Sequence, residues 1–273
     1  MANYTPYIKR LWNMHIPTIW GDITAKKDPD VFTPNGSQIY HGYQGEGKTL
    51  SMYHAGSKLK ARYPRAMLVS NLHLRDFVAV RVATSQELVE ALKTFDAEKQ
   101  YFFFESHTDL MLVLREVRNG EYGVIFMIDE IHNYFHSHDS KSMPMWVVQV
   151  FSQQRKQRLV ILGTVQLWPD VIKAIRDQVD NLIGCSRRGH LISQTAIDPR
   201  TAESNYGETE FVIRKKGFFW ITRAIREGYD TYQVINSGRE IMGGNDLMIG
   251  NVPANGKVKK PKQNRQQYDR KYN

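Results

Sequence analysis

The clearest chemical pattern in the chain spans the eight residues from Gly42 to Thr49. They read Gly-Tyr-Gln-Gly-Glu-Gly-Lys-Thr and match G-x-x-x-x-G-K-[ST] without a gap. Glycines let successive backbone N–H groups turn inward around a phosphate, and a following helix adds its positive dipole end. An apolar stretch precedes the loop and a helical stretch follows it, as this motif requires. We therefore predict a site for the phosphates of ATP.

Each residue type in this loop has a predicted role. Lys48 is expected to reach the β- and γ-phosphates, and the Thr49 hydroxyl to ligate Mg²⁺. The alternative, a glycine turn that binds nothing, is disfavoured by the strand and the helix on either side. The predicted nucleotide-binding residues are Gly42, Gly45, Glu46, Gly47, Lys48, Thr49 and Leu50.

Two acids follow the apolar run Gly-Val-Ile-Phe-Met-Ile, at a predicted strand end. Asp129 is placed to hold Mg²⁺ through water, and Glu130 to polarise the water that attacks the γ-phosphate. An acid at the Glu130 position is typical of NTPases that hydrolyse their substrate. The alternative is a strand that ends on two solvated acids.

Polar residues also follow the next apolar run, Leu-Val-Ile-Leu-Gly. Thr164 and Gln166 lie where neighbouring strand ends of an α/β sheet converge on a ligand. Gln166 is expected to contact the γ-phosphate or its water and to report hydrolysis to the sheet. A glutamine that only caps the following helix is the alternative.

Basic residues that could complete the site cluster after these strands. In ring-forming ATPases, an arginine of one subunit stabilises transition-state charge in its neighbour. Arg155 and Arg176 are the first candidates for this role, and Arg187 and Arg188 belong to a further basic cluster. Surface or DNA-facing charges are the alternative reading for each of them.

Three histidines, His132, His136 and His138, lie within seven positions of each other. His132 and His136 have the i, i+4 spacing that could place two metal ligands on one helix face. The H-E-x-x-H signature of a zinc site is lacking, however. We interpret them as loop histidines near the nucleotide pocket.

The elements that must position these residues alternate between short apolar runs and amphipathic stretches. This alternation predicts an α/β fold with a mostly parallel sheet flanked by helices. The strands are expected near residues 38–41, 66–74, 101–106, 123–129 and 159–165, and the helices near 48–62, 85–95, 107–120, 143–157 and 169–179. From about residue 190 an antiparallel hairpin is expected, with Lys216-Gly217 between its runs. Its segment Gly-Phe-Phe-Trp-Ile-Thr has the alternation of a half-buried hairpin, not of a base-stacking platform.

The chain has 273 residues, one cysteine (Cys185) and a net charge of +9, from 37 Lys plus Arg against 28 Asp plus Glu. The single cysteine excludes an internal disulfide. A basic balance suits a polyanion such as nucleic acid, although a basic protein without such a partner is the alternative. No apolar run is long enough for a membrane-spanning helix, so we expect a protein of the host cytoplasm.

Three regions are predicted along the chain. Residues 1–35 have no sustained periodicity and are interpreted as an N-terminal arm. Residues 36–249 form the ATPase domain with its β-hairpin addition. Residues 250–273 carry seven Lys/Arg and one acid, which predicts a basic flexible tail. The tail could grip nucleic acid weakly through its lysines and two tyrosines, or have no function.

Taken in order, these motifs resemble the FtsK/HerA-like division of P-loop ATPases, with a RecA/ASCE-like core. Within it the chain is similar to Zot-type (zonular occludens toxin) phage proteins and viral genome-packaging ATPases. The resemblance runs from about Ile39 to Arg188, and its most specific part is the order Ser-Gln-Gln-Arg-Lys-Gln, Gly-Thr-Val-Gln, Asp-Val-Ile-Lys-Ala-Ile-Arg-Asp-Gln-Val-Asp. Zot-type proteins usually carry a membrane-spanning helix after the ATPase domain, and this sequence shows none.

The resemblance implies a homo-oligomer, as a hexameric ring, that hydrolyses ATP with Mg²⁺ and moves the DNA of a virus or mobile element. A capsid or membrane portal component and association with the virion are further implied partners and locations. Two alternatives stay open: a Zot-like ATPase for virion assembly or export, and a nucleotide-gated scaffold with little turnover.

Overall fold

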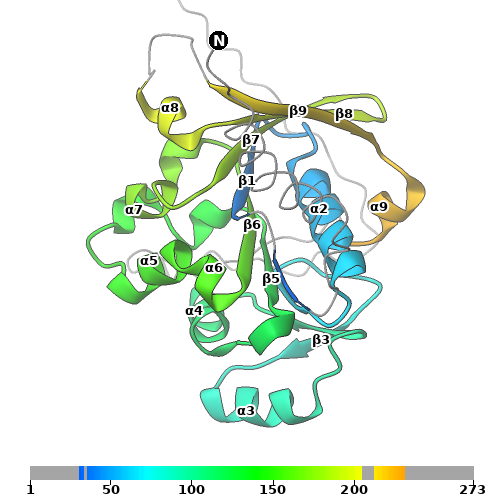
Figure 1. Cartoon of the computed structure of the whole chain (residues 1–273), viewed down its shortest axis with the longest axis vertical. Coiled ribbons are helices and arrows are strands. Elements are labelled where there is room, and N and C mark those ends of the chain that lie inside the picture. Colours follow the sequence, from blue (N-terminus) through cyan, green and yellow to red (C-terminus); the bar gives the residue numbers. More distant parts are fainter. Residues whose placement is uncertain (1–30, 34–35, 205–211, 231–273) are drawn as a thin grey trace, which may run out of the picture. The chain divides into compact units, whose positions relative to one another are not determined.

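A computed structural model describes residues 31–33, 36–204 and 212–230 (Figure 1). Within these residues nine strands form one sheet, in the spatial order β3-β4-β2-β5-β6-β1-β7-β8-β9. All pairings from β3 to β7 are parallel, and β7, β8 and β9 pair antiparallel. The strands are β1 (Gln38–His41), β2 (Met67–Ser70), β3 (Val78–Arg81), β4 (Gln100–Phe103), β5 (Val124–Ile128), β6 (Leu159–Val165), β7 (Asn181–Arg188), β8 (Leu191–Ile197) and β9 (Ile213–Trp220). The predicted fold class, a mostly parallel sheet with added antiparallel strands, is confirmed.

Helices cover both faces of the parallel part of the sheet, as Figure 1 shows. Ile125 and Met127 of β5 point toward α2, whereas Val124, Phe126 and Ile128 point toward α4 and α5. This division follows from the two-residue period of a strand. Because both faces are covered, the central strands are apolar at nearly every position. The helices are α2 (Lys48–Arg62), α3 (Ser85–Thr94), α4 (His107–Glu116), α5 (Met145–Ser152), α6 (Gln154–Gln157), α7 (Lys173–Arg176), α8 (Pro199–Ser204) and α9 (Arg223–Glu227), with 3₁₀ turns η1 (Gly120–Tyr122), η2 (Ile131–Asn133), η3 (Ser137–Asp139) and η4 (Trp168–Asp170).

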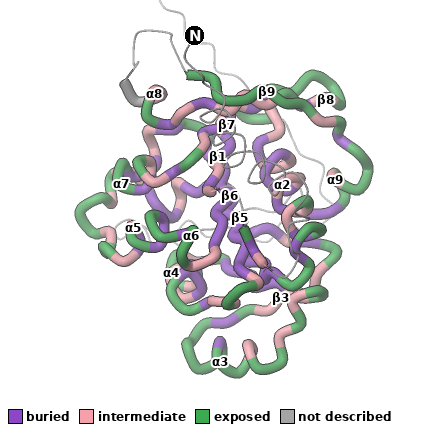
Figure 2. Tube along the Cα trace, in the orientation of Figure 1, coloured by how far each residue is buried: buried purple, intermediate pink, exposed green. Residues whose placement is uncertain are grey.

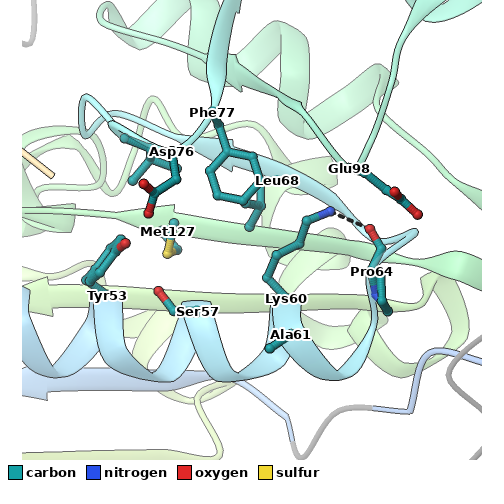
Figure 3. A pocket seen from close by; sticks show the side chains of 12 residues that line it. Tyr53, Ser57, Lys60, Ala61, Pro64, Leu68, Asp76, Phe77, Glu98 and Met127 are labelled. Carbon is teal, nitrogen blue, oxygen red and sulfur yellow. Dashed lines mark hydrogen bonds between the residues drawn. The ribbon is translucent and has the colours of Figure 1, made fainter. Parts of the chain in front are cut away.

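The long helix α2 is fixed at its far end by a buried lysine (Figure 3). Lys60 Nζ donates to the carbonyls of Pro64, Ala66 and Ala97 at 2.6, 2.7 and 2.6 Å. Burial lowers the pKa of this ammonium to about 8. Lys60 closes one end of a cavity of about 440 Å³ between α2 and the sheet, whose other walls include Tyr53. The three hydrogen bonds fix the helix that carries Lys48 and Thr49 at its start.

Several predicted elements are shorter than expected or were missed. Helix α2 begins and ends as predicted. The expected helix over 143–157 is interrupted at Gln153. Strand β3 lies between residues 74 and 85, where no strand or helix was predicted. The expected helix over 169–179 is instead η4, an extended pair and the four-residue α7. The extended pair forms because Val171 bridges to His136 and Ile172 donates its N–H to the Phe135 carbonyl.

The antiparallel addition also differs from its prediction. The reversal falls at Gly189-His190, between β7 and β8, and Gly189 has φ 59°, which favours glycine. Lys216-Gly217 is not a turn, because β9 runs straight through it and pairs along β8. Most of β9 is exposed to solvent (Figure 2), so this strand is less buried than the half-buried hairpin that was expected, and only Phe219 in it is half-buried.

The ordered fold reaches into the predicted N-terminal arm. Phe32 is buried, donates its N–H to the Glu121 carbonyl and packs edge-on against Tyr63. Its ring also fills the space where a side chain at Gly123 would lie. The predictions for residues 1–30 and for the tail at 250–273 lie outside the described residues. No helix among the described residues is long and apolar enough to cross a membrane.

Candidate nucleotide site

The predicted phosphate loop leaves the carboxyl end of β1 and enters α2. Gly45 and Gly47 have φ values of 85° and 83°, in the left-handed region that favours glycine. A Cβ on Gly47 would also lie 2.5 Å from Cδ1 of Ile192 in β8. Within the loop, the Tyr43 N–H donates to Glu46 Oε2 at 2.7 Å. The loop conformation therefore depends on glycines at these positions, as the motif predicts.

Lys48 and Thr49 occupy the first turn of α2. Lys48 is buried, and its Nζ donates to the Tyr43 carbonyl of the loop at 3.1 Å. Leu50 follows and packs partly against the core on the α2 side of the sheet. The Thr49 hydroxyl donates to Asp129 Oδ1 at 2.9 Å, across 80 positions of sequence. The structure thus brings the predicted loop and the first predicted acid into direct contact.

Asp129 is the centre of this group. Its Oδ1 also accepts a hydrogen bond from the Thr164 hydroxyl at 2.6 Å. Burial raises the pKa of the Asp129 carboxyl to about 6; the neighbouring Glu130 charge adds to the rise, while the hydroxyls of Thr164 and Thr49 oppose it. A divalent cation at this carboxyl would favour the charged form.

The backbone of Asp129 is held by a residue that the sequence analysis missed. The Asp129 N–H donates to Asn71 Oδ1 at 2.8 Å, and Asn71 Nδ2 donates to the Asp129 carbonyl at 2.9 Å. Asn71 is buried, follows β2 and also donates to Tyr134 Oη at 3.3 Å. Its side chain continues the β2–β5 pairing beyond the last strand residue. The local signal is only a polar residue directly after the apolar run of β2.

Glu130 has an unusual backbone conformation for a residue other than glycine, with φ 51° and ψ 55°. Its N–H donates to the Thr164 hydroxyl at 2.8 Å, and its Oε2 lies 3.4 Å from Nδ1 of His132. Non-glycine residues in this region are strained and concentrate at functional sites. The Thr164 hydroxyl therefore contacts both predicted acids, since it donates to the Asp129 carboxylate and accepts from the Glu130 N–H. Its position after an apolar run predicts that Thr164 lies at the site, but not that it makes these two contacts.

The strand order explains this convergence. Strand β6 lies between β1 and β5, so Thr164 near its end lies between the phosphate loop and the acids. Gln166 follows β6 at the same edge and is exposed. The predicted sensor position thus follows the strand that lies between the loop and the acids.

The two arginines predicted as finger candidates lie elsewhere. Arg155 is exposed on α6, directly before the amino end of β6, at the edge of the sheet opposite the phosphate loop. Arg176 ends α7, and its Nη1 donates to the Trp168 carbonyl at 3.5 Å. By contrast, Arg187 and Arg188 end β7, which runs parallel to β1 and leads to the edge with the loop. Arg155 therefore lies at the edge of the sheet away from the phosphate loop, and Arg176 is bonded to the Trp168 carbonyl.

The oxygen atoms at the centre of the site fit the preferences of Mg²⁺. A carboxylate and two hydroxyls meet within hydrogen-bond distance, and Mg²⁺ favours such hard oxygen ligands together with phosphate and water. In the part of the chain that the structure describes, no group of three or more His, Cys, Asp or Glu could hold a metal ion. Of the three loop histidines, His136 and His138 stack with their ring centroids 4.8 Å apart.

No family model matches this chain, and no curated protein matches its sequence. Solved structures do match its fold. The N-terminal domain of zonular occludens toxin from Neisseria meningitidis is 15% identical, with a TM-score of 0.47, over 72% of this chain and 100% of that one. The genome packaging NTPase of Sulfolobus turreted icosahedral virus 2, in complex with ATP-gammaS, is 12% identical, with a TM-score of 0.43, over 69% and 98%.

Proposed function

We propose that this chain is an ATP-hydrolysing motor that moves DNA, working as a ring of identical subunits, in a virus or other mobile element. One observation carries the ATPase part of the proposal. Thr49 after β1, Asp129 after β5 and Thr164 in β6 form one hydrogen-bonded group, with Glu130 beside it. A structural role alone gives no reason to bury a carboxyl among two hydroxyls next to a glycine loop.

The proposed reaction is the attack of water on the γ-phosphate. The loop amides and Lys48 bind the β- and γ-phosphates, and Thr49 with Asp129 would hold Mg²⁺, which supplies charge neutralisation on those phosphates. Glu130 accepts the proton of the attacking water while the bond between the γ-phosphorus and the ADP oxygen breaks. Gln166 lies at the same edge and is the proposed contact to the water or the γ-phosphate.

Coupling to movement is proposed to run through the strand ends. The Thr164 hydroxyl contacts the Asp129 side chain and the Glu130 backbone, so a change at either acid reaches β6 directly. An arginine from a neighbouring subunit would complete the site. Arg155 and Arg176 remain the proposed fingers for the site of a neighbouring subunit.

The DNA part of the proposal is supported by charge and by the motif resemblance. The net charge of +9 suits a polyanionic partner. A soluble ring in the host cytoplasm is proposed, hexameric as in the division that the motifs resemble, with a capsid or portal component as a further partner. An assembly or export ATPase, or a scaffold that binds ATP without turnover, would share the nucleotide site.

Steady-state phosphate release from ATP, with and without DNA, tests the proposal. We expect a several-fold stimulation by DNA that decreases as salt increases, because phosphate contacts are salt-sensitive. Turnover that is indifferent to DNA would contradict the motor and favour the assembly ATPase. Binding of ATP without turnover would favour the scaffold.

A further inference from the structure

The three antiparallel strands at one edge of the sheet carry an unusual set of charges. Strands β7, β8 and β9 contain no Asp or Glu, and each of their charged residues is basic: Arg187, Arg188, Arg214, Lys215 and Lys216. The remaining polar residues are mainly hydroxyls and amides. Arg214 is already paired with Asp198, which directly follows β8. The other cations, together with the hydroxyls, suit a chain of phosphates.

Among the described residues, one face of these strands packs on α2. The other face is buried only at Leu182 and Ile197, at the end away from Arg188. On the covered face, Cys185 Sγ contacts the Ser51 hydroxyl at 3.4 Å, and Phe219 stacks on His54 of α2 at 4.3 Å. The pairing register assigns the opposite face, here called the outer face. Its residues are Ser186, Arg188, Leu191, Ser193, Thr195, Lys216, Phe218 and Trp220.

Two large aromatic side chains stand exposed on the outer face. Phe218 and Trp220 are 73% and 63% exposed, whereas Phe219 between them is half-buried against α2. Exposed aromatic residues are costly in water, and neighbouring pairs of them mark interaction surfaces. Since the two are separated by two positions in a strand, their Cα atoms lie about 6.7 Å apart, roughly twice the base rise of a nucleic-acid strand.

We propose that the outer face of β7–β9 binds single-stranded nucleic acid. Bases stack on Phe218 and Trp220, and Arg188 and Lys216 contact the phosphates on either side. The inference rests on the proposed function, which identifies the polyanion as nucleic acid. It adds that the nucleic acid is single-stranded and that the outer face binds it. Bases within a duplex are stacked on each other, so an open sheet face reaches them only in a single strand.

A second copy of this chain is a less favourable occupant. β9 is the edge strand of the sheet, and pairing with the β9 of another copy would bring two sets of Arg214, Lys215 and Lys216 together. Like charges on facing strands destabilise such a pairing. Phosphates, in contrast, neutralise the same cations.

Strands β7 and β8 also border the nucleotide site, on the face opposite the outer face. Cys185 of β7 and Ile192 of β8 bound the phosphate loop, their nearest atoms lying 3.0 and 2.5 Å from a Cβ placed on Gly42 and Gly47. Arg188 and Trp220 lie at the end of the strands nearest the loop. A strand bound there would therefore contact elements that touch the nucleotide loop.

Fluorescence anisotropy of a labelled oligothymidylate, measured without nucleotide, tests the proposal. Replacing both aromatics, Phe218→Ala with Trp220→Ala, should weaken binding by roughly tenfold or more. Trp220→Phe should retain most of the affinity, and Lys216→Glu should weaken binding and make it less salt-dependent. The control Val78→Ala, an exposed residue of the other edge strand, should leave the affinity unchanged.

Several outcomes would overturn the proposal. One is unchanged affinity of the double variant, with folding verified by thermal unfolding. Another is duplex binding that is as tight and as dependent on the two aromatics. If sedimentation shows that the double variant loses self-association while its affinity persists, the outer face is a subunit interface instead. If the wild-type chain hydrolyses ATP but binds no single strand, this inference fails and the proposed ATPase stands.

Discussion

Strands β5 and β9 belong to the same sheet but have opposite environments. Every residue of β5 is buried, whereas seven of the eight residues of β9 are exposed and Phe219 alone is half-buried. β5 is apolar throughout and ends on the two acids of the nucleotide site. β9 is basic and aromatic and ends the sheet as an edge strand. One half of the sheet therefore provides stability and chemistry, and the other provides surface.

The difference has a physical origin in what covers each strand. β5 has helices on both faces and strands on both sides, so every backbone and side-chain position is enclosed. β9 pairs with a strand on one side, and its Phe219 stacks on His54 of α2. Most of its side chains are exposed, so their types are set less by packing, although Arg214 is paired with Asp198 at 2.6 Å. The predictions below test this division, from the largest expected effect to the smallest.

Lys48→Ala should abolish tight binding of ATP. The variant removes the ammonium at the start of α2 that is proposed to meet the β- and γ-phosphates. Calorimetry with a non-hydrolysable ATP analogue measures the loss. Lys58→Ala, an exposed change on the same helix, is the matched control. If the Lys48 variant kept its affinity for the ATP analogue, the parallel half of the sheet would not be the part that binds the nucleotide.

Glu130→Gln should leave nucleotide binding intact and reduce turnover by about 10²- to 10⁴-fold, the range for loss of a general base. Phosphate release and analogue binding are measured on the same preparation. Glu121→Gln, an exposed acid before β5, should change neither. A normal rate in the Glu130 variant would remove this carboxylate from the mechanism.

Phe126→Ala should lower the free energy of unfolding by about 3–5 kcal/mol, because it opens a cavity in the fully buried centre of β5. Urea unfolding followed by circular dichroism gives the value. A loss below about 1 kcal/mol would contradict the view that the parallel half supplies the stability.

Asn71→Ala should cost about 1–3 kcal/mol, since it leaves the buried N–H and carbonyl of Asp129 without these partners. Turnover should fall as well, because the backbone that aims both acids is released. Asn119→Ala removes two comparable hydrogen bonds, to the carbonyls of Arg65 and Gly123, far from the site. If both variants lose stability and neither loses turnover, Asn71 has only a structural role.

Phe218→Ala should change the free energy of unfolding by no more than about 0.5 kcal/mol, as expected for an exposed side chain. The same residue type thus gives two very different losses on β5 and β9. If Phe218→Ala lowered the free energy of unfolding about as much as Phe126→Ala, the outer face would be packed in solution. That result would contradict the difference between β5 and β9.

The sequence predicted the parts of the site whose geometry is local. The phosphate loop, α2 and the two acids at the end of β5 follow from spacing and periodicity over short stretches. Asn71 could not be predicted in this way, because its role depends on β2 and β5 becoming neighbours 58 positions apart. The orientation of Arg155 likewise depends on which edge of the sheet α6 reaches.

The errors in the antiparallel part have the same cause. Lys216-Gly217 has the local chemistry of a turn, but pairing with β8 keeps it extended, and the turn forms at Gly189 instead. Alternation in β9 predicts one covered and one open face, yet it does not say how little of the covered face is buried, which is Phe219 alone. Coverage depends on helices that are distant in sequence, so tertiary packing overrides the local pattern.

Phe32 has a consequence for how the chain can be shortened. Its ring fills the space over Gly123 and meets Tyr63, its N–H reaches Glu121, and its carbonyl accepts from Arg158 at 3.4 Å. Phe32 therefore fills a space at the edge of the sheet opposite the nucleotide site. An N-terminal truncation that starts at residue 36 would leave an aromatic-sized hole there, and one that starts before residue 31 would keep it filled.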